Sequence, residues 1–357
     1  MDIARRANRV RMVAALTAAV CATSVLAACS SSGGDNKGSG AGGTGIKGQR
    51  FKVLIASSPS PNKVVEQHVI DILKNEGVNA SLVFTEAQSS VQLAQVTHGD
   101  VDAYAEATAG AISAINQGIP LVDFGLLQPR QDYVFIARPG INSLADLKGK
   151  KIGVIDTVGV NWAQALIVLK EAGLTANDVH MVTAGGQSAR LSAMVAGRID
   201  ATMLSHSAQI QLEPKGYKVL YDYTRQASEL YDDNLFATKK WLDSHQELAL
   251  AVNKAILQSF AWFNDPANAD AVLNRALEVA PGSDKQATKQ LLETLRTGQA
   301  YPEGTILDTK VIDQEQQLFL SAKAIEKTAP TAQWVQTSFG EQAKAALASG
   351  TPSTGSS

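Results

Sequence analysis

The fold is decided by one stretch of the chain, Gly185-Gly186-Gln187-Ser188-Ala189-Arg190-Leu191-Ser192-Ala193-Met194-Val195-Ala196-Gly197-Arg198-Ile199-Asp200-Ala201-Thr202-Met203. Its first residues predict a loop that leads into a helix, with Gln187 or Ser188 as the capping residue and serine as the better cap. Leucine, methionine and valine at helical spacing predict that one face of this helix is buried. A left-handed Gly197 should end the helix, and a short buried strand should follow from Ile199 to Leu204.

A similar stretch stands 98 residues earlier, Ser89-Ser90-Val91-Gln92-Leu93-Ala94-Gln95-Val96-Thr97-His98-Gly99-Asp100-Val101-Asp102-Ala103-Tyr104. In this register Ser90 aligns with Ser188, the two helix-ending glycines align, and Asp102 aligns with Asp200. Chance could produce any one of these matches, but the three together indicate a repeated unit. The sequence therefore predicts two similar lobes.

Composition places the chain among ordinary globular proteins and excludes several functions. It has 357 residues, 45% hydrophobic residues and a net charge of −2, which suggests about two domains and gives no basic surface for nucleic acid. Its two cysteines, Cys21 and Cys29, form no CxxC motif, and no zinc-ligand spacing or HExxH motif is present. Residues 186–190 lack the final glycine of a nucleophile elbow. We therefore expect no metal, no cofactor and no enzymatic activity.

The amino terminus predicts export. Arginines precede an apolar run from Met12 to Ala28, which is typical of a signal peptide over residues 1–28. The run ends Leu26-Ala27-Ala28-Cys29, which resembles the lipobox of bacterial lipoproteins and implies that Cys29 is acylated; the alternative is an ordinary signal peptide with a chance cysteine. Residues 29–49 are rich in glycine and serine, which is typical of a flexible tether. We expect an extracytoplasmic protein, lipid-anchored at the outer face of a membrane.

Strands alternate with helices over the rest of the chain, which predicts α/β lobes with mostly parallel sheets flanked by helices. We expect a first lobe from residues 50–136, a second lobe over 137–234, and a return to the first lobe with C-terminal helices over 235–349. Residues 350–357 should be a disordered tail.

Three segments resemble one known family, namely Ser143–Val154, Met194–Ala201 and Asn234–Phe260. They are similar to segments of type II periplasmic solute-binding proteins of ABC importers, in the branch that serves nitrate, sulfonate, taurine and thiamine-precursor transport. The resemblance implies two lobes joined by two hinge strands, which close on a small molecule and deliver it to an ABC permease driven by its ATPase. We expect a monomer.

Candidate ligand-binding residues follow from where helices begin after parallel strands, because ligands bind beyond the carboxyl ends of such strands. The loops there are rich in hydrogen-bonding side chains, and the candidates are Ser57, Ser58, Ser89, Ser90, Glu106, Thr108, Thr157, Asn161, Trp162, Gln187, Ser188 and Ser205. The serines could instead be caps or turn residues, and Trp162 could pack between elements. Glu106 could pair with a cationic ligand group or be solvated.

The chemistry of the solute stays open between sulfonate, nitrate and a pyrimidine-like molecule. The nearest cations, Lys63 and Arg190, lie in the first turns of helices rather than in the loops, which disfavours a bidentate clamp on an anion. Helix N-termini alone could hold one. A pyrimidine would fit Trp162, Tyr104 and the polar loops at least as well. Two other functions stay open: a lipoprotein that senses a ligand for a receptor, and an enzyme acting on a pyrimidine-like molecule.

Overall fold

The computed structural model describes residues 45–350 except 158 and 227–229. The predicted signal peptide, Cys29, the predicted tether up to residue 44 and residues 351–357 of the predicted tail lie outside the described residues. None of the helices within the described ranges has both the length and the apolar character needed to cross a membrane.

The first lobe is built on a five-stranded sheet whose strands lie in the order β2 (Asn79–Phe84), β1 (Arg50–Ile55), β3 (Ala103–Glu106), β10 (Asp233–Thr238) and β4 (Leu121–Gln128). Strand β1 pairs in parallel with β2 and β3, whereas β10 runs antiparallel to both of its neighbours. The strand that lies between β3 and β4 therefore comes from far along the chain.

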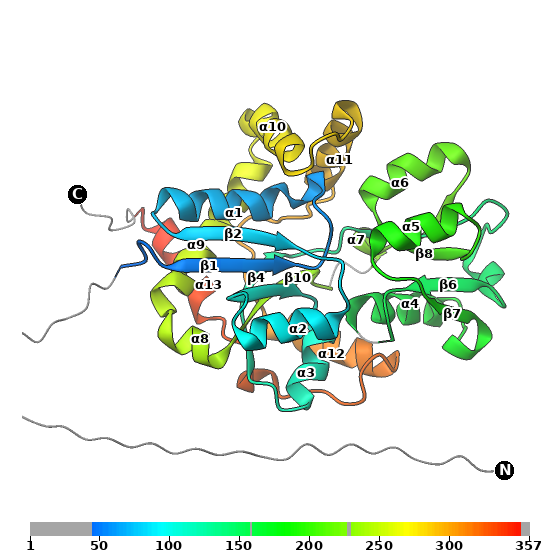
Figure 1. Ribbon diagram of the computed structural model, residues 1–357, viewed down its shortest axis with the longest axis horizontal. Coiled ribbons are helices and arrows are strands. Elements are labelled where there is room, and N and C mark those ends of the chain that lie inside the picture. Colours follow the sequence, from blue (N-terminus) through cyan, green and yellow to red (C-terminus); the bar gives the residue numbers. More distant parts are fainter. Residues whose placement is uncertain (1–44, 158, 227–229, 351–357) are drawn as a thin grey trace, which may run out of the picture. The chain divides into compact units, whose positions relative to one another are not determined.

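The second lobe repeats this arrangement in a sheet ordered β7 (His180–Thr183), β6 (Lys151–Val154), β8 (Ala201–Ser205), β5 (Tyr133–Ala137) and β9 (Lys218–Asp222). Again three strands are parallel, and the fourth position, β5, is antiparallel to both neighbours. Figure 1 shows helices on both sides of each sheet. The prediction of two similar α/β lobes with mostly parallel sheets is confirmed.

The chain crosses between the sheets twice, once between β4 and β5 and once between β9 and β10. The first crossover covers residues 129–132, so it precedes the boundary expected after residue 136, because β5 already belongs to the second sheet. The second crossover contains the short helix α7 (Tyr223–Gln226).

Helices before the first crossover are η1 (Pro61–Lys63), α1 (Val64–Asn75), α2 (Ser89–His98) and α3 (Thr108–Asn116). Those of the second lobe are η2 (Leu144–Leu147), α4 (Gly159–Glu171), η3 (Ala176–Asp178), α5 (Gln187–Val195), α6 (His206–Leu212) and η4 (Glu213–Lys215). The C-terminal part contributes α8 (Lys239–Ser244), α9 (Gln246–Asn264), η5 (Pro266–Asn268), α10 (Ala269–Val279), α11 (Lys285–Thr297), α12 (Thr309–Ser321), η6 (Thr331–Gln333) and α13 (Ser338–Ala348).

The aligned aspartates of the repeat play the same structural part in both lobes. A carboxylate oxygen of Asp102 accepts the backbone N–H of Lys52 at 2.8 Å, and Asp200 accepts the N–H of Lys151 at 2.8 Å. An arginine also pairs with each carboxylate. The repeated aspartate therefore ties the strand that follows each glycine-ended helix to the beginning of the neighbouring strand.

Two predictions about local structure are wrong. The N-cap residues of α2 and α5 are Gln88 and Gly186 rather than serines, and neither N-cap residue makes a side-chain cap hydrogen bond. At α5 a carboxylate from the other lobe, that of Glu86, accepts the N–H of Ser188 at 3.3 Å. A negative charge at a helix N-terminus thus replaces the expected serine cap.

The sequence analysis also missed β4, which is buried along its whole length. Asp123 and Gly125 interrupt its apolar pattern, and both residue types are uncommon in strands. The buried carboxylate of Asp123 accepts a hydrogen bond from the side-chain amide of Asn234 on β10 at 2.7 Å. A partner on the adjacent strand therefore makes a polar residue acceptable there.

Candidate functional site

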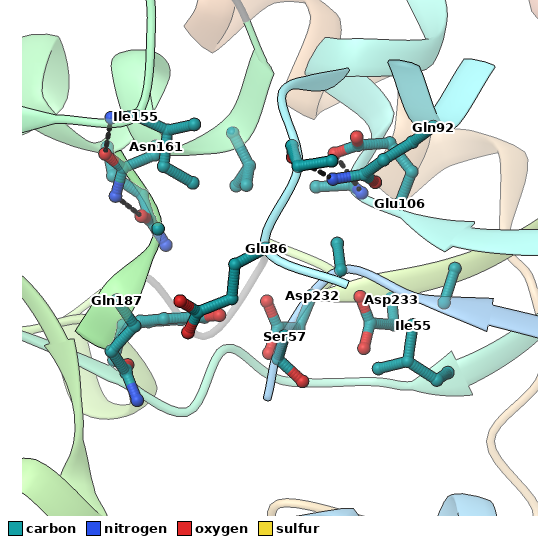
Figure 2. Close-up of a pocket in the computed structure, with 18 of the residues that line it drawn as sticks. Ile55, Ser57, Glu86, Gln92, Glu106, Ile155, Asn161, Gln187, Asp232 and Asp233 are labelled. Carbon is teal, nitrogen blue, oxygen red and sulfur yellow. Dashed lines mark hydrogen bonds between the residues drawn. The ribbon is translucent and has the colours of Figure 1, made fainter. Parts of the chain in front are cut away.

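A cavity of about 60 Å³ lies between the lobes and is lined from both of them (Figure 2). The first lobe and the second crossover contribute Ile55, Ala56, Ser57, Lys63, Glu86, Ala87, Gln92, Ala105, Glu106, Ala107, Asp232 and Asp233. The second lobe contributes Tyr133, Ile155, Asp156, Val160, Asn161, Gln164, Gly186, Gln187 and Arg190. Most of these residues stand at or just after the carboxyl ends of β1, β2, β3, β6 and β7, where parallel sheets bind ligands.

Four of the residues expected at a binding site line this cavity: Ser57, Glu106, Asn161 and Gln187. Asn161 and Gln187 are held by the backbone, because their side-chain oxygens accept the N–H groups of Ile155 and Ser205 at 2.9 Å. The hydroxyl of Ser57 has no hydrogen-bond partner among the described residues. The structure thus brings together candidates from both lobes that are as much as 130 residues apart in the chain.

Two further candidates, Ser58 and Ser188, lie beside the cavity rather than in its lining. Their hydroxyls donate to the same carboxylate oxygen of Glu86, at 2.9 Å and 3.0 Å. Glu86 belongs to the first lobe and Ser188 to the second, so this carboxylate bridges the two lobes. In Figure 2 the Glu86 side chain extends toward Gln187 of the second lobe.

The remaining candidates have other surroundings. Thr108 is fully buried and donates to Glu315 at 2.6 Å, and the hydroxyl of Ser205 pairs with that of Ser207 at 2.7 Å. Trp162 packs against the apolar core. Ser90 and Thr157 are exposed, and the side chain of Ser89 is not among those that the structure describes.

Sequence reasoning did not select nine polar residues of the cavity, namely Lys63, Glu86, Gln92, Tyr133, Asp156, Gln164, Arg190, Asp232 and Asp233. Glu86 follows the end of β2, so its position after a parallel strand could have identified it. Lys63 and Arg190 were placed in helix first turns, yet those turns face the cavity. Asp232 and Asp233 sit in the second crossover and at the start of β10, and nothing local in the sequence marks that position.

Lys63 is buried and its ammonium group is surrounded by protein acceptors. The Nζ atom lies 2.8 Å from Gln128, 2.9 Å from Asp233 and 3.0 Å from Glu66. Burial lowers the pKa of Lys63, but the nearby carboxylates outweigh burial and hold the pKa well above its usual value. Its charge is therefore balanced inside the protein rather than presented to a ligand.

Arg190 is also buried, and backbone carbonyls hold two arms of its guanidinium group. Its Nη1 and Nη2 atoms donate to the carbonyls of Gly185 at 2.8 Å and Met203 at 3.2 Å. Burial lowers its pKa to about 10, so it stays charged at neutral pH. The Nε atom has no hydrogen-bond partner among the described residues.

Two carboxyl groups of the cavity, those of Glu106 and Asp232, have raised pKa values. Burial, with the charges of Asp233 and Asp156, raises the pKa of Glu106 to about 8, although the N–H of Ala107 donates to it at 3.0 Å. Burial and Asp233 likewise raise the pKa of Asp232 well above its usual range. These groups hold their protons more tightly than exposed carboxyls do.

The lobes approach so closely beside Glu86 that a side chain at residue 186 has no room. A Cβ atom on Gly186 would lie 2.5 Å from the Cβ of Glu86, well inside van der Waals contact. Since the backbone φ of Gly186 is −60°, glycine is required here for space rather than for its backbone conformation.

A buried histidine, His206, joins the first crossover to the end of β9, where the second crossover begins. The Nδ1 atom of His206 lies 2.5 Å from a carboxylate oxygen of Asp132 in the first crossover. Its Nε2 atom lies 3.6 Å from Asp222 at the end of β9. Asn62 of the first lobe donates to Asp132 at 2.6 Å. Burial lowers the pKa of His206, but the two aspartates raise it to about 10, so the imidazole is charged at neutral pH.

Within the described part of the chain, no group of three or more histidine, cysteine, aspartate or glutamate side chains is arranged to hold a metal ion. The polar groups of the cavity are hydrogen-bond donors and acceptors from both lobes. Such an arrangement can enclose and orient a small polar molecule.

Comparisons with known proteins support this description of the fold. A sequence model of the NMT1/THI5-like family matches residues 73–269. No curated protein sequence matches the chain significantly.

Solved structures resemble the chain over most of its length. The alkanesulfonate-binding protein SsuA from Xanthomonas axonopodis pv. citri, bound to MOPS, is 18% identical, with 81% of this chain and 99% of that chain covered at a TM-score of 0.66. The periplasmic nitrate-binding protein NrtA from Synechocystis PCC 6803 is 9% identical, with 85% and 90% covered at 0.67. The desulfurization enzyme DSZB is 16% identical, with 82% and 99% covered at 0.55. At these identities the likeness establishes the fold.

Proposed function

Because the chain belongs to the NMT1/THI5-like family, we propose that it is a solute-binding protein that captures a small molecule between its two lobes. The observation that carries this proposal is the cavity, which is lined by loops from both lobes at the carboxyl ends of their parallel strands. The bridge from Glu86 to Ser188 supports it further, because such a contact can form only when the lobes are closed.

Ligand binding without turnover is the first test. The chain without its predicted signal peptide is screened by thermal unfolding against amines, amino acids, sulfonates, nitrate, pyrimidines and flavin precursors. A ligand present at a hundred times its dissociation constant should stabilise the protein by about 2.7 kcal/mol. We expect stabilisation by one chemical class and no new product on prolonged incubation. Formation of a product would favour an enzyme, as the similarity to DSZB allows.

We further propose that the protein is anchored through an acylated Cys29 and hands its solute to an ABC permease and its ATPase. The lipobox resemblance at Cys29 and the Gly/Ser-rich segment after it support the anchor. The test is metabolic labelling with a fatty acid: label should appear in the wild type and be absent from Cys29→Ser. Binding of the loaded protein to a permease in lipid nanodiscs, rather than to a sensor ectodomain, would separate transport from sensing.

A further inference from the structure

Acidic groups outnumber basic groups in the wall of the cavity. Among the described residues that line it, five carry carboxyl groups, namely Glu86, Glu106, Asp156, Asp232 and Asp233. Two are basic, namely Lys63 and Arg190. The undescribed internal residues, 158 and 227–229, add no lysine or arginine to the sequence. The cavity wall therefore has an excess of acidic groups.

The two basic groups offset only part of this excess. Lys63 contacts Asp233 but also Glu66, a further carboxylate behind the wall, so that this trio keeps an acidic surplus. Arg190 directs two arms of its guanidinium group to backbone carbonyls. Of these two groups, a sulfonate or nitrate would therefore find an unused donor only at the Nε of Arg190, and it would lie among buried carboxyl groups.

Three of the other acids, Glu86, Glu106 and Asp232, accept hydrogen bonds from neutral donors. Serine hydroxyls donate to Glu86, the N–H of Ala107 donates to Glu106, and the side-chain amide of Gln128 donates to Asp232 at 2.5 Å. Neutral donors orient these carboxyl groups, but they supply no counter-charge. Ionisation of a buried carboxyl group is favourable only when a counter-charge joins it.

An independent observation comes from Gln92, which lines the cavity and is 4% exposed. Its Nε2 atom donates to the carbonyl of Ala87 at 2.8 Å, which fixes the orientation of the amide. The Oε1 atom is then left buried without a partner. Figure 2 shows Gln92 beside Glu106. A buried acceptor without a partner is unfavourable, so a ligand that donates a hydrogen bond to the Oε1 atom of Gln92 would be stabilised here.

We propose that the solute is a small organic cation that carries N–H donors, of the amine, guanidine or amidine class. Its charge balances the acidic wall, and its N–H groups donate to the carboxylates of Glu106 and Asp232 and to the free oxygen of Gln92. An acceptor elsewhere on the same solute would meet the Nε of Arg190 on the opposite lobe. This inference rests on the proposed function, since it names the class of molecule that the cavity holds.

Calorimetric titration of the chain without its predicted signal peptide tests the inference. The probes are methylammonium, methylguanidine, acetamidine and guanidinoacetate, against tetramethylammonium, methanesulfonate, taurine and nitrate. We expect at least one N–H-bearing cation or its zwitterionic form to bind at least tenfold more tightly than tetramethylammonium and than the two anions. Tighter binding of methanesulfonate or nitrate, or equal binding of tetramethylammonium, would overturn the inference while leaving solute binding intact. Binding by no probe overturns it as well, and failure across the broad thermal screen would contradict solute binding itself.

Proton linkage gives a second readout that does not depend on which cation binds. Glu106 faces Asp233, Asp156 and the hydroxyl of Tyr104, and its pKa of about 8 keeps it mostly protonated at pH 7. A bound cation favours the ionised form, so binding at pH 7 should release a proton, which is measured by titration in buffers of different ionisation enthalpy. Proton uptake on binding would contradict the inference.

The matched variants are Glu106→Gln, which removes the charge and keeps the shape, and Asp270→Asn, which removes an exposed acid on α10. We expect Glu106→Gln to weaken cation binding at least tenfold at pH 8.5 and to abolish its share of proton release. Asp270→Asn should change neither. Unchanged cation binding in a folded Glu106→Gln protein, with its melting temperature measured in the same series, would overturn the inference.

Discussion

Glu315 shows why a polar residue after a strand can belong to the core rather than to a binding site. Its two carboxyl oxygens accept the hydroxyl of Thr108 and the N–H of Tyr231, each at 2.6 Å. Thr108 was expected at the cavity because it opens a helix after β3. The sequence could not indicate its partner, which lies 207 residues further along the chain.

The buried Glu315 predicts a dependence of stability on pH. Burial raises its pKa to about 8, above the value it has in the unfolded chain, so its contribution to stability is complete below about pH 4.5 and is lost as pH rises to about 8. Within this window the loss approaches about 1.4 kcal/mol per pH unit. Urea unfolding at pH 5 to 8 should give a shallower decline for Glu315→Gln than for the wild type. Parallel curves would contradict the assignment.

The aligned serines of the repeat differ in their surroundings, which makes a controlled comparison possible. Ser188 donates to Glu86 of the other lobe, whereas Ser90 is exposed. Ser188→Ala should weaken ligand binding by roughly 3- to 10-fold, because a bond that forms only on closure contributes about 0.5–1.5 kcal/mol. Ser90→Ala is the control and should bind as the wild type does. Equal weakening in both variants would mean that the contact with Glu86 is not what matters.

At the scale of the element, the loops after β2 and β7 meet each other across the cavity. Their approach depends on Gly186, where a methyl group would overlap Glu86. We expect Gly186→Ala to disfavour the closed arrangement and to weaken ligand binding at least tenfold, with a change in melting temperature of the free protein within a few degrees. Gly45→Ala is a suitable control, because a Cβ there meets nothing within 4 Å.

Two measurements check this prediction. Titration with a ligand found in the thermal screen gives the affinities of both variants, and small-angle scattering of the free proteins reports whether the alanine at residue 186 increases the radius of gyration. A Gly186→Ala protein that binds as tightly as Gly45→Ala would show that the neighbouring loop can move aside without loss.

Sequence patterns predicted elements well where a local signal marks both ends. Ser143 forms a capping box with Asp146 at the start of η2, and Gly197 has the expected left-handed φ of 70°. Strand β4 was not predicted, because the contacts that make its polar residues acceptable join segments more than a hundred residues apart. One such contact is the hydrogen bond from Asn234 to Asp123. The N-terminal contact of α5 was not predicted for a related reason, since Glu86 approaches this helix from the other lobe.

At the scale of the whole molecule, His206 links Asp132 in the first crossover to Asp222, the last residue of β9 before the second crossover. Asp132 and Asp222 raise its pKa to about 10, so its contribution to stability is complete below about pH 6.5 and is lost as pH rises toward 10. Thermal unfolding from pH 6.5 to 10 should show a steeper decline for the wild type than for His206→Gln. A variant that declines as steeply would place the pH dependence elsewhere.

The repeat in the sequence predicted two lobes, because its elements recur in the same order. The two sheets confirm this, since the strand order β2-β1-β3-β10-β4 of the first sheet matches the order β7-β6-β8-β5-β9 of the second. Of the cavity, the sequence indicated Ser57, Glu106, Asn161 and Gln187, which lie at the ends of parallel strands or in the turns and helix starts after them. It could not indicate the acidic excess, because Asp232 and Asp233 reach the cavity only after the chain has crossed back. The solute class named above therefore depends on the tertiary structure.

The position of β10 has a consequence for the order in which the chain can fold. All five strands of the second sheet lie within residues 133–222, so a chain made from its amino end holds that sheet complete while the first still lacks its middle strand. Until residue 238 is available, β3 and β4 have unfilled hydrogen-bonding edges facing one another. The nascent first lobe should therefore be the half that depends on protection against aggregation, and a fragment of the second lobe the half that can be isolated.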